Sequence, residues 1–445
     1  MTSIIEGSEP AIAAESHIFA IPPSFADRFR TEEERIGPTA AIPENIPAGG
    51  DINFYIAPSS NAMVSLPDLS IELEVALKKR NTDNSWDRIQ MTDTCAPVNN
   101  LIHSMFQSVQ VSVANRLVSD CAIYYPYRAM FECLLSYTKD AMGTQLTSSG
   151  FYLDKAGSFD DAAGNTGEQA RLTLFTKYEY IPLSGKLFSD IFMQDKPLIT
   201  GVPLQIRFVL HKPEFYLRDW ANPVTSEYRL FIRNPRIFVR RYVGVPEYMN
   251  AISKRLLTTT AKYPIERVLM RPIELPANIQ STVFNNIHIG QVPKVLFVAF
   301  ATADAFNGTK KANPFNFQHF NLSQISVEVD GQSFPNRPYE PDYANGKYLD
   351  CYDGLLDTLG RRNSPFGALP FNRDEYAKGF CIYGFDLTPG GTGLGPLSLI
   401  RQGNLGIRVV FSEPLRQPTI MITLLTFDAV IEINNFRQLI CDFTN

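Results

Sequence analysis

One segment of the chain occurs twice, and this repeat limits the possible folds more than any other feature. LQIRFVLHKP begins at Leu204 and LGIRVVFSEP begins at Leu405, with apolar residues, an arginine and a proline at identical spacing. The offset between the two segments is 201 residues. A chain of 445 residues exceeds what one core usually supports, so about two domains are expected. The repeat predicts that these two domains are copies of one fold.

Two further pairs of segments recur in the same order. Val109, Val111 and Val113 alternate with smaller or polar residues, which is the period of a half-buried strand. The same pattern returns around Val327 at an offset of 216, where Asp330-Gly331 follows as a hairpin turn. A leucine pair recurs at an offset of 221, inside two helices that we predict over Tyr124–Tyr137 and Tyr348–Leu359.

The strand pattern indicates an all-β fold with short helices. About eight antiparallel strands per half, with helices only in the crossovers, are typical of a jelly roll. The predicted fold is therefore two tandem eight-stranded jelly rolls, with an acidic arm over 1–45, a first jelly roll over 46–245 and a second over 246–445. Expected strands include the following: Leu172–Ile181, Leu204–Leu210, the pair Tyr228–Ile232 and Arg236–Tyr242, and Thr419–Ile433.

Charge is concentrated in the arm. Residues 1–45 carry eight carboxylates and three arginines, a net charge of −5 that equals the net charge of the whole chain. Such a segment would repel phosphates, so we do not expect it to bind a genome. Prolines after residue 37 limit any helix in the arm to about Phe25–Arg35. It is either a mobile tail or an arm that orders against a partner subunit.

Five arginines, at positions 229, 233, 236, 240 and 241, lie close together in the sequence. They could form a patch that faces nucleic acid or an acidic protein. The solvated face of two strands is the interpretation that we favour.

No motif for catalysis or cofactor binding is present. No two of the five histidines lie within ten residues, the six cysteines form no CxxC pair, and there is no GxSxG or P-loop. We therefore expect no enzymatic activity, metal or cofactor. No apolar run approaches the ~18 residues of a membrane span, and no signal peptide is expected.

The segment Asn313–Leu322 (NPFNFQHFNL) holds more large rings than an ordinary exposed loop. Its rings either pack in the core or contact a second subunit. We name the following candidate subunit-interface residues: Phe315, Phe317, Phe320, Tyr125 and Tyr127.

This segment, with the later Val329-Asp330-Gly331-Gln332, closely resembles the major capsid protein of Polinton (Maverick) elements and the related adintoviruses. Other pieces match in the same order: YPYRA from Tyr125, SDIFMQD from Ser189, TTAKYPI from Thr259, RDEYAKG from Arg373 and DLTP from Asp386. The resemblance covers the chain from about Phe19 to its end, except the loop Gly390–Gly395.

What the resemblance implies is a double jelly-roll subunit of a virion. Three chains would form a pseudo-hexameric, hexon-like capsomer, and capsomers would tile an icosahedral shell around double-stranded DNA after assembly in the host nucleus or cytoplasm. Neighbouring capsomers and penton and minor capsid proteins would be its partners, with no sequence-specific nucleic acid and no membrane span. Two alternatives remain: a monomeric jelly-roll enzyme or carbohydrate-binding protein, and a penton or minor capsid protein with one jelly roll.

Overall fold

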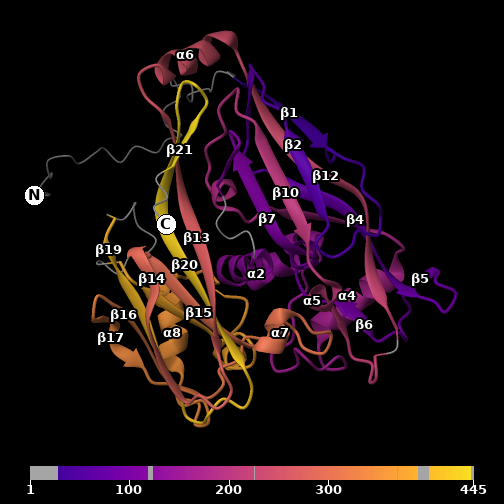
Figure 1. The fold of residues 1–445 in the computed structure, drawn as a ribbon, viewed down its shortest axis with the longest axis vertical. Helices are drawn as coiled ribbons and strands as arrows, with labels where there is room; N and C mark the ends of the chain where they lie inside the picture. The colour runs from indigo at the N-terminus through magenta and orange to yellow at the C-terminus, as the bar shows by residue number, and fades with distance from the viewer. Residues whose placement is uncertain (1–28, 119–123, 225, 368, 389–399, 442–445) are drawn as a thin grey trace, which may run out of the picture.

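The computed structural model describes residues 29–118, 124–224, 226–367, 369–388 and 400–441. Two β-sandwiches lie side by side, the first coloured indigo to magenta and the second orange to yellow in Figure 1. Helix α2 (Tyr125–Ser136) lies between them, and α6 (Pro246–Leu256) lies at the end of the molecule, where the first sandwich leads into the second.

The first sandwich consists of two antiparallel sheets. One sheet has the order β1 (Phe29–Ile36), β12 (Tyr228–Gly244), β4 (Ser70–Arg80) and β9 (Ile181–Lys186), with β3 (Ala62–Val64) on β12 and β5 (Trp86–Arg88) on β4. The facing sheet has the order β2 (Asp51–Ile56), β10 (Leu204–Leu210), β7 (Phe106–Val113) and β8 (Arg116–Leu117). A separate pair joins β6 (Cys95–Pro97) to β11 (Leu217–Asp219).

The second sandwich repeats this arrangement. One sheet has the order β13 (Ala261–Leu275), β20 (Thr419–Ile433), β15 (Val295–Thr302) and β18 (Ile382–Asp386), with β21 (Leu439–Cys441) on β20. The facing sheet has the order β14 (Ser281–Gln291), β19 (Gln402–Phe411), β16 (Leu322–Val329) and β17 (Gln332–Tyr339).

The two sandwiches share one topology. When the eight main strands of each are numbered in chain order, both contain one sheet in the order 1-8-3-6 and one in the order 2-7-4-5. This is the connectivity of a jelly roll, so the predicted double jelly roll is confirmed. The sequence repeat also holds at single-residue level. Val111 pairs with Ile206 in the first domain, and Val327 pairs with Ile407 in the second.

These four equivalent side chains are all at most 1% exposed and lie in the cores between the sheets. Burial of each one contributes about 1.5–3 kcal/mol relative to an exposed position. The alternation that reveals the repeat therefore exists because one face of each strand lines a core.

Helices and short 3₁₀ turns occupy the crossovers. Besides α2 and α6, they are α1 (Leu101–Ser104), α3 (Lys139–Gly143), η2 (Gln145–Ser149), α4 (Thr166–Lys177), η3 (Asp190–Met193), α5 (Pro213–Tyr216), α7 (Ala303–Asn307), α8 (Leu349–Thr358) and α9 (Arg373–Tyr376). The predicted helices over Tyr124–Tyr137 and Tyr348–Leu359 are confirmed as α2 and α8.

The predicted strand over Leu172–Ile181 is wrong, because most of that segment belongs to α4. Asn165 caps this helix by accepting a hydrogen bond from the Glu168 amide at 3.4 Å. The buried positions include 168, 171, 172 and 175, which is helical spacing, but two of them are charged. A hydrophobicity pattern cannot reveal a helix face that buries Glu168 and Arg171.

The predicted strand pair over 228–242 is one continuous strand, β12. It passes through Asn234 in the left-handed region (φ 50°), where the pairing with β4 shifts register. A residue at positive φ lets the strand absorb extra residues as a bulge without ending.

The acidic arm is partly a strand, and the helix limit set for Phe25–Arg35 does not describe it. Phe29–Ile36 forms β1 and pairs along β12, so this part of the predicted arm belongs to a sheet of the first jelly roll. Glu33 lies 3.2 Å from Arg240, and Glu34 lies 3.0 Å from Arg241. Residues 1–28 lie outside the described part of the chain.

The arginine cluster on β12 is therefore largely matched by carboxylates. Arg229 also pairs with Glu227 at 2.6 Å, and Arg233 pairs with Glu44 at 2.9 Å. Four of the five arginines have acidic partners within the chain, which agrees with the interpretation of a solvated strand face.

Candidate functional site at the domain junction

The segment that follows α7 in the second domain crosses to the first domain. The backbone N–H of Asn313 donates to Asp160 Oδ1 at 2.6 Å, and its side-chain amide donates to Asp154 Oδ2 at 3.1 Å. The amide of Asn316 donates to Asp160 Oδ2 at 2.9 Å. Two carboxylates of the first domain thus hold two asparagines of the second.

Buried arginines compensate the carboxylates on the first-domain side. Arg171 donates to Asp154 at 2.6 Å, and Arg218 holds Glu168 through two hydrogen bonds of 2.6 and 2.5 Å. These four side chains are at most 3% exposed. Burial raises the pKa of Glu168, although hydrogen bonds and charge from Arg218 act in the opposite direction. Burial of such a pair carries a desolvation penalty, so the pair adds little net stability, but it fixes the geometry of both side chains. Removal of one partner strongly destabilises the protein, because it leaves the other charge buried and unpaired.

A third buried pair connects the domains at another point. Arg128 on α2 donates to Asp190 in η3, and Asp190 Oδ1 also accepts the Val268 N–H of β13 at 3.3 Å. The carboxylate therefore bridges a helix of the first domain to a strand of the second.

Aromatic rings fill the rest of the junction. Tyr127 stacks on Phe306 with ring centroids 4.9 Å apart, and it meets Phe315 edge-on at 5.7 Å. Phe131 and Phe317 lie 5.3 Å apart. Each pair joins α2 of the first domain to a segment of the second, and each adds about 0.5–1.5 kcal/mol beyond its buried area.

The five candidate interface residues occupy three environments. Phe315, Phe317 and Tyr127 are at most 2% exposed and lie where the two domains of one chain meet. Tyr125 is buried in the first domain, where its hydroxyl lies 2.9 Å from His103 Nδ1. Phe320 is partly exposed just before β16. Contact with a second subunit stays a prediction, and only Phe320 has appreciable surface free within the chain to make one.

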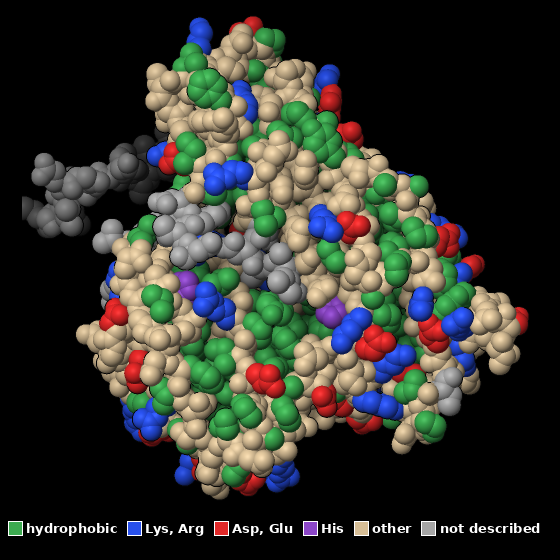
Figure 2. Space-filling model, viewed as in Figure 1, with side chains coloured by type: hydrophobic (Ala, Val, Ile, Leu, Met, Phe, Trp, Pro, Cys, Tyr) green, Lys and Arg blue, Asp and Glu red, His purple; other side chains and the backbone are tan. Residues whose placement is uncertain are grey.

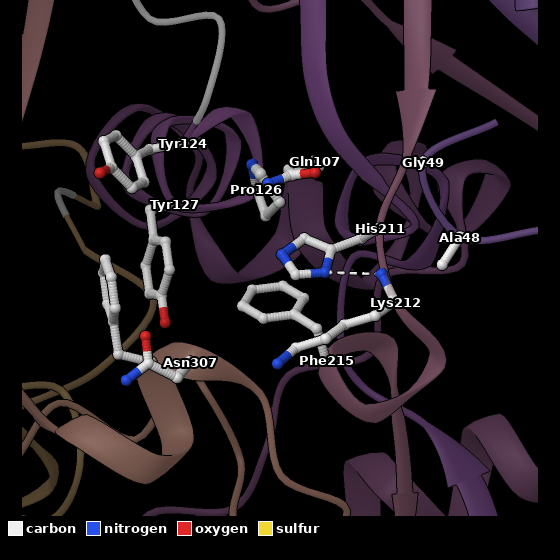
Figure 3. Close-up of a pocket in the computed structure, with 11 residues that line it drawn as sticks. Ala48, Gly49, Gln107, Tyr124, Pro126, Tyr127, His211, Lys212, Phe215 and Asn307 are labelled. Atoms are coloured by element: carbon white, nitrogen blue, oxygen red, sulfur yellow. Dashed lines mark hydrogen bonds between the residues drawn. The ribbon is translucent and has the colours of Figure 1, made fainter. Parts of the chain in front are cut away.

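A cavity of about 460 Å³ opens beside the stacked rings of Tyr127 and Phe306, and Figure 3 shows the residues that line it. First-domain residues surround most of it, and Phe306 and Asn307 of α7 close it from the second domain. His211 stacks on Phe215 with ring centroids 4.0 Å apart, and His211 Nδ1 accepts the Lys212 N–H at 2.8 Å. Burial and the nearby Lys212 cation lower the pKa of His211 to about 4.

The sequence does not assign the polar residues of the junction to a site. Asn313 belongs to the ring-rich segment, where the density of aromatic residues is the visible signal and a single asparagine is not. Asp154 and Asp160 lie in the Gly-, Ser- and Asp-rich stretch 138–169, where a carboxylate in a buried pair has the same signature as one in solvent. Among the described residues, no group of three or more His, Cys, Asp or Glu side chains could hold a metal ion. In the same part of the chain, no helix has the length and apolarity to cross a bilayer.

The topology makes the protein a double jelly-roll protein, and comparisons place this fold among known structures. The chain aligns over its full length with 95% of a chain of the Sputnik virophage cryo-EM structure, with a TM-score of 0.64 and 12% identity. It aligns over 96% of its length with 93% of the Faustovirus major capsid protein (TM-score 0.58, 9% identity). It aligns over 99% of its length with 96% of the mavirus major capsid protein (TM-score 0.53, 11% identity). At these identities the likeness establishes the fold.

Sequence comparison finds a relative of unstated function. An uncharacterised protein of Caenorhabditis elegans, F54H12.2, is 22% identical over 350 residues, which cover 78% of this chain and 82% of that protein. No protein-family model matches the chain.

Proposed function

We propose that the protein is a major capsid protein, a structural subunit that tiles an icosahedral shell. The observation that carries this proposal is the duplicated jelly roll, which extends over the described chain and matches capsid proteins along nearly their whole length. The motifs shared with Polinton and adintovirus capsid proteins support a narrower assignment to that group, and double-stranded DNA would be the cargo.

The fold suits a trimeric capsomer. Three chains with two similar sandwiches each give six similar lateral faces around a closed three-fold ring. The buried ion pairs and rings at the junction hold the two sandwiches of a chain in one orientation, which a regular tiling requires. Stable contacts between such subunits bury about 2,000 Å² or more.

Light scattering on the purified full-length protein tests the proposal. A stable trimer has a mass of about 150 kDa, three times the 50.0 kDa of one chain. A monomer at micromolar concentration that binds a sugar or turns over a substrate would instead favour the carbohydrate-binding or enzyme alternative. Electron microscopy of the same preparation adds a second readout, because six-lobed particles of trimeric mass are expected only for a hexon-like capsomer.

A further inference from the structure

We propose that the cavity between the two jelly rolls binds a small organic carboxylate with an apolar body, such as a medium-chain fatty acid or an aryl carboxylic acid. The proposal does not depend on the capsid function. It rests on the size of the cavity, its aromatic walls and the hydrogen-bond donors that converge on it.

The cavity has the volume and construction of a small-molecule site. Its volume of about 460 Å³ falls within the ~300–1,000 Å³ range of such sites. It lies at a domain boundary, which is one of the preferred places for ligand pockets. Figure 2 shows hydrophobic side chains gathered in the hollow between the two domains.

Two aromatic pairs form the walls. Tyr127 and Phe306 stack on one side, with an interplanar angle of 19°. His211 and Phe215 stack on the other, with an angle of 16°. Figure 3 shows Tyr127 and His211 on opposite sides, with Pro126 between them. An apolar body would contact ring faces and the proline ring.

Every polar side chain that lines the cavity can donate a hydrogen bond, although the amides of Gln107 and Asn307 can also accept one. Because His211 Nδ1 accepts the Lys212 N–H, the neutral imidazole carries its proton on Nε2. Figure 3 shows this second ring nitrogen facing the cavity, toward Tyr127. Lys212 supplies an exposed ammonium group at the rim. The Tyr127 hydroxyl is buried and has no hydrogen-bond partner among the described residues.

Charge complementarity selects an anion. None of the eleven described residues that line the cavity is acidic, and one of them is a lysine. A carboxylate accepts hydrogen bonds and donates none, so it matches an N–H donor, an ammonium group and an unpartnered hydroxyl. An uncharged alcohol of the same shape can accept a hydrogen bond, but it brings no negative charge to match the Lys212 ammonium group.

Titration calorimetry on the full-length protein tests the site with two carboxylates, octanoate and 2-naphthoate, and with octanol and 2-naphthalenemethanol as uncharged matches. At least one carboxylate is expected to bind saturably and about tenfold or more tightly than its alcohol. The preferred carboxylate distinguishes an aliphatic from an aromatic ligand. Equal binding of acid and alcohol, or no saturable binding at millimolar concentration, overturns the proposal.

Variants locate the binding. Lys212→Met keeps the apolar stem, His211→Phe keeps the stack on Phe215, and Tyr127→Phe removes one buried hydroxyl. The first two are expected to weaken carboxylate binding about tenfold, and Lys254→Met on α6 is expected to leave it unchanged. If Lys212→Met and His211→Phe fold with wild-type melting curves and bind as wild type does, the carboxylate binds elsewhere and the assignment is wrong. Tyr127→Phe is nearly isosteric and is also expected to weaken carboxylate binding about tenfold, so it keeps the test decisive if another variant fails to fold.

Discussion

Asn313→Ala should separate the contribution of the domain junction from that of the two cores. The Asn313 side chain is 2% exposed, donates to Asp154 at 3.1 Å and accepts the Phe315 N–H at 3.0 Å. Truncation removes both hydrogen bonds and deprives a buried carboxylate and a buried amide of a partner. Each such loss costs about 1–3 kcal/mol, so the free energy of unfolding should fall by about 2–6 kcal/mol.

Urea unfolding at fixed protein concentration measures this change, because any oligomer makes apparent stability depend on concentration. The midpoint should fall, and the transition should broaden or split if the domains begin to unfold separately. Asn435→Ala is the matched control. Its side chain is exposed on the turn before β21, and the expected change is within about 0.5 kcal/mol.

A double-mutant cycle with Asp154→Asn isolates the contact between the domains. Residues that share a buried hydrogen bond show coupling energies of about 0.5–3 kcal/mol. If the two substitutions add within about 0.3 kcal/mol, or if Asn313→Ala costs less than 1 kcal/mol, the hydrogen bonds across the junction do not hold the domains together.

Three other perturbations address the buried polar groups and the repeat. Burial lowers the pKa of His103 to about 3, below its ordinary value of 6.5. At His103 the unfolded chain therefore binds more protons between these values, so this residue contributes a loss of about 2 kcal/mol in stability from pH 7 to pH 5, which His103→Asn removes. The lowered pKa of His211 adds a separate loss over the same range. Arg218→Met should cost about 3–5 kcal/mol in urea unfolding, because it leaves Glu168 buried without its cation. Ile206→Val and Ile407→Val should each cost about 0.5–1.5 kcal/mol, with similar values in the two domains.

Each of these three predictions has either a control variant or a result that would contradict it. Arg416→Met removes an exposed pair with Glu413 and should change stability by less than about 1 kcal/mol. An identical slope of stability against pH in wild type and His103→Asn would contradict the buried neutral imidazole. A difference above 2 kcal/mol between the two isoleucine variants would show that equivalent strands sit in unlike cores.

The sequence predicts the parts of the fold in which burial and polarity agree. Val111, Ile206, Val327 and Ile407 are apolar, buried and regularly spaced, so the strands and their duplication are visible without coordinates. Where buried residues are charged, as in α4, the hydrophobicity pattern does not predict the element. It does not predict strand β1 for the opposite reason: seven of the eight residues are exposed, and ion pairs with β12 replace a buried apolar face.

The candidate site shows a second limit. Ring density in the segment of Phe315 and Phe317 indicates correctly that these side chains must be covered. It cannot say whether the covering surface is another subunit or the other domain, because both bury apolar area in the same way. Local sequence patterns do not show which distant residue a side chain contacts. Asn313 and Asp154, for example, are hydrogen-bonded although they lie 159 positions apart in the sequence.

The position of β12 in its sheet determines when the first sandwich can close during translation. This strand lies between β1 and β4, yet it is the last strand of the first sandwich to be translated. A growing chain cannot close that sandwich until Gly244 has left the ribosome, and β20 imposes the same delay on the second. Until the late strand arrives, β1 and β13 have no partner in their sheets, and β4 and β15 are paired on one side alone. Nascent chains of this protein should therefore depend on chaperones more than chains whose neighbouring strands pair as they emerge.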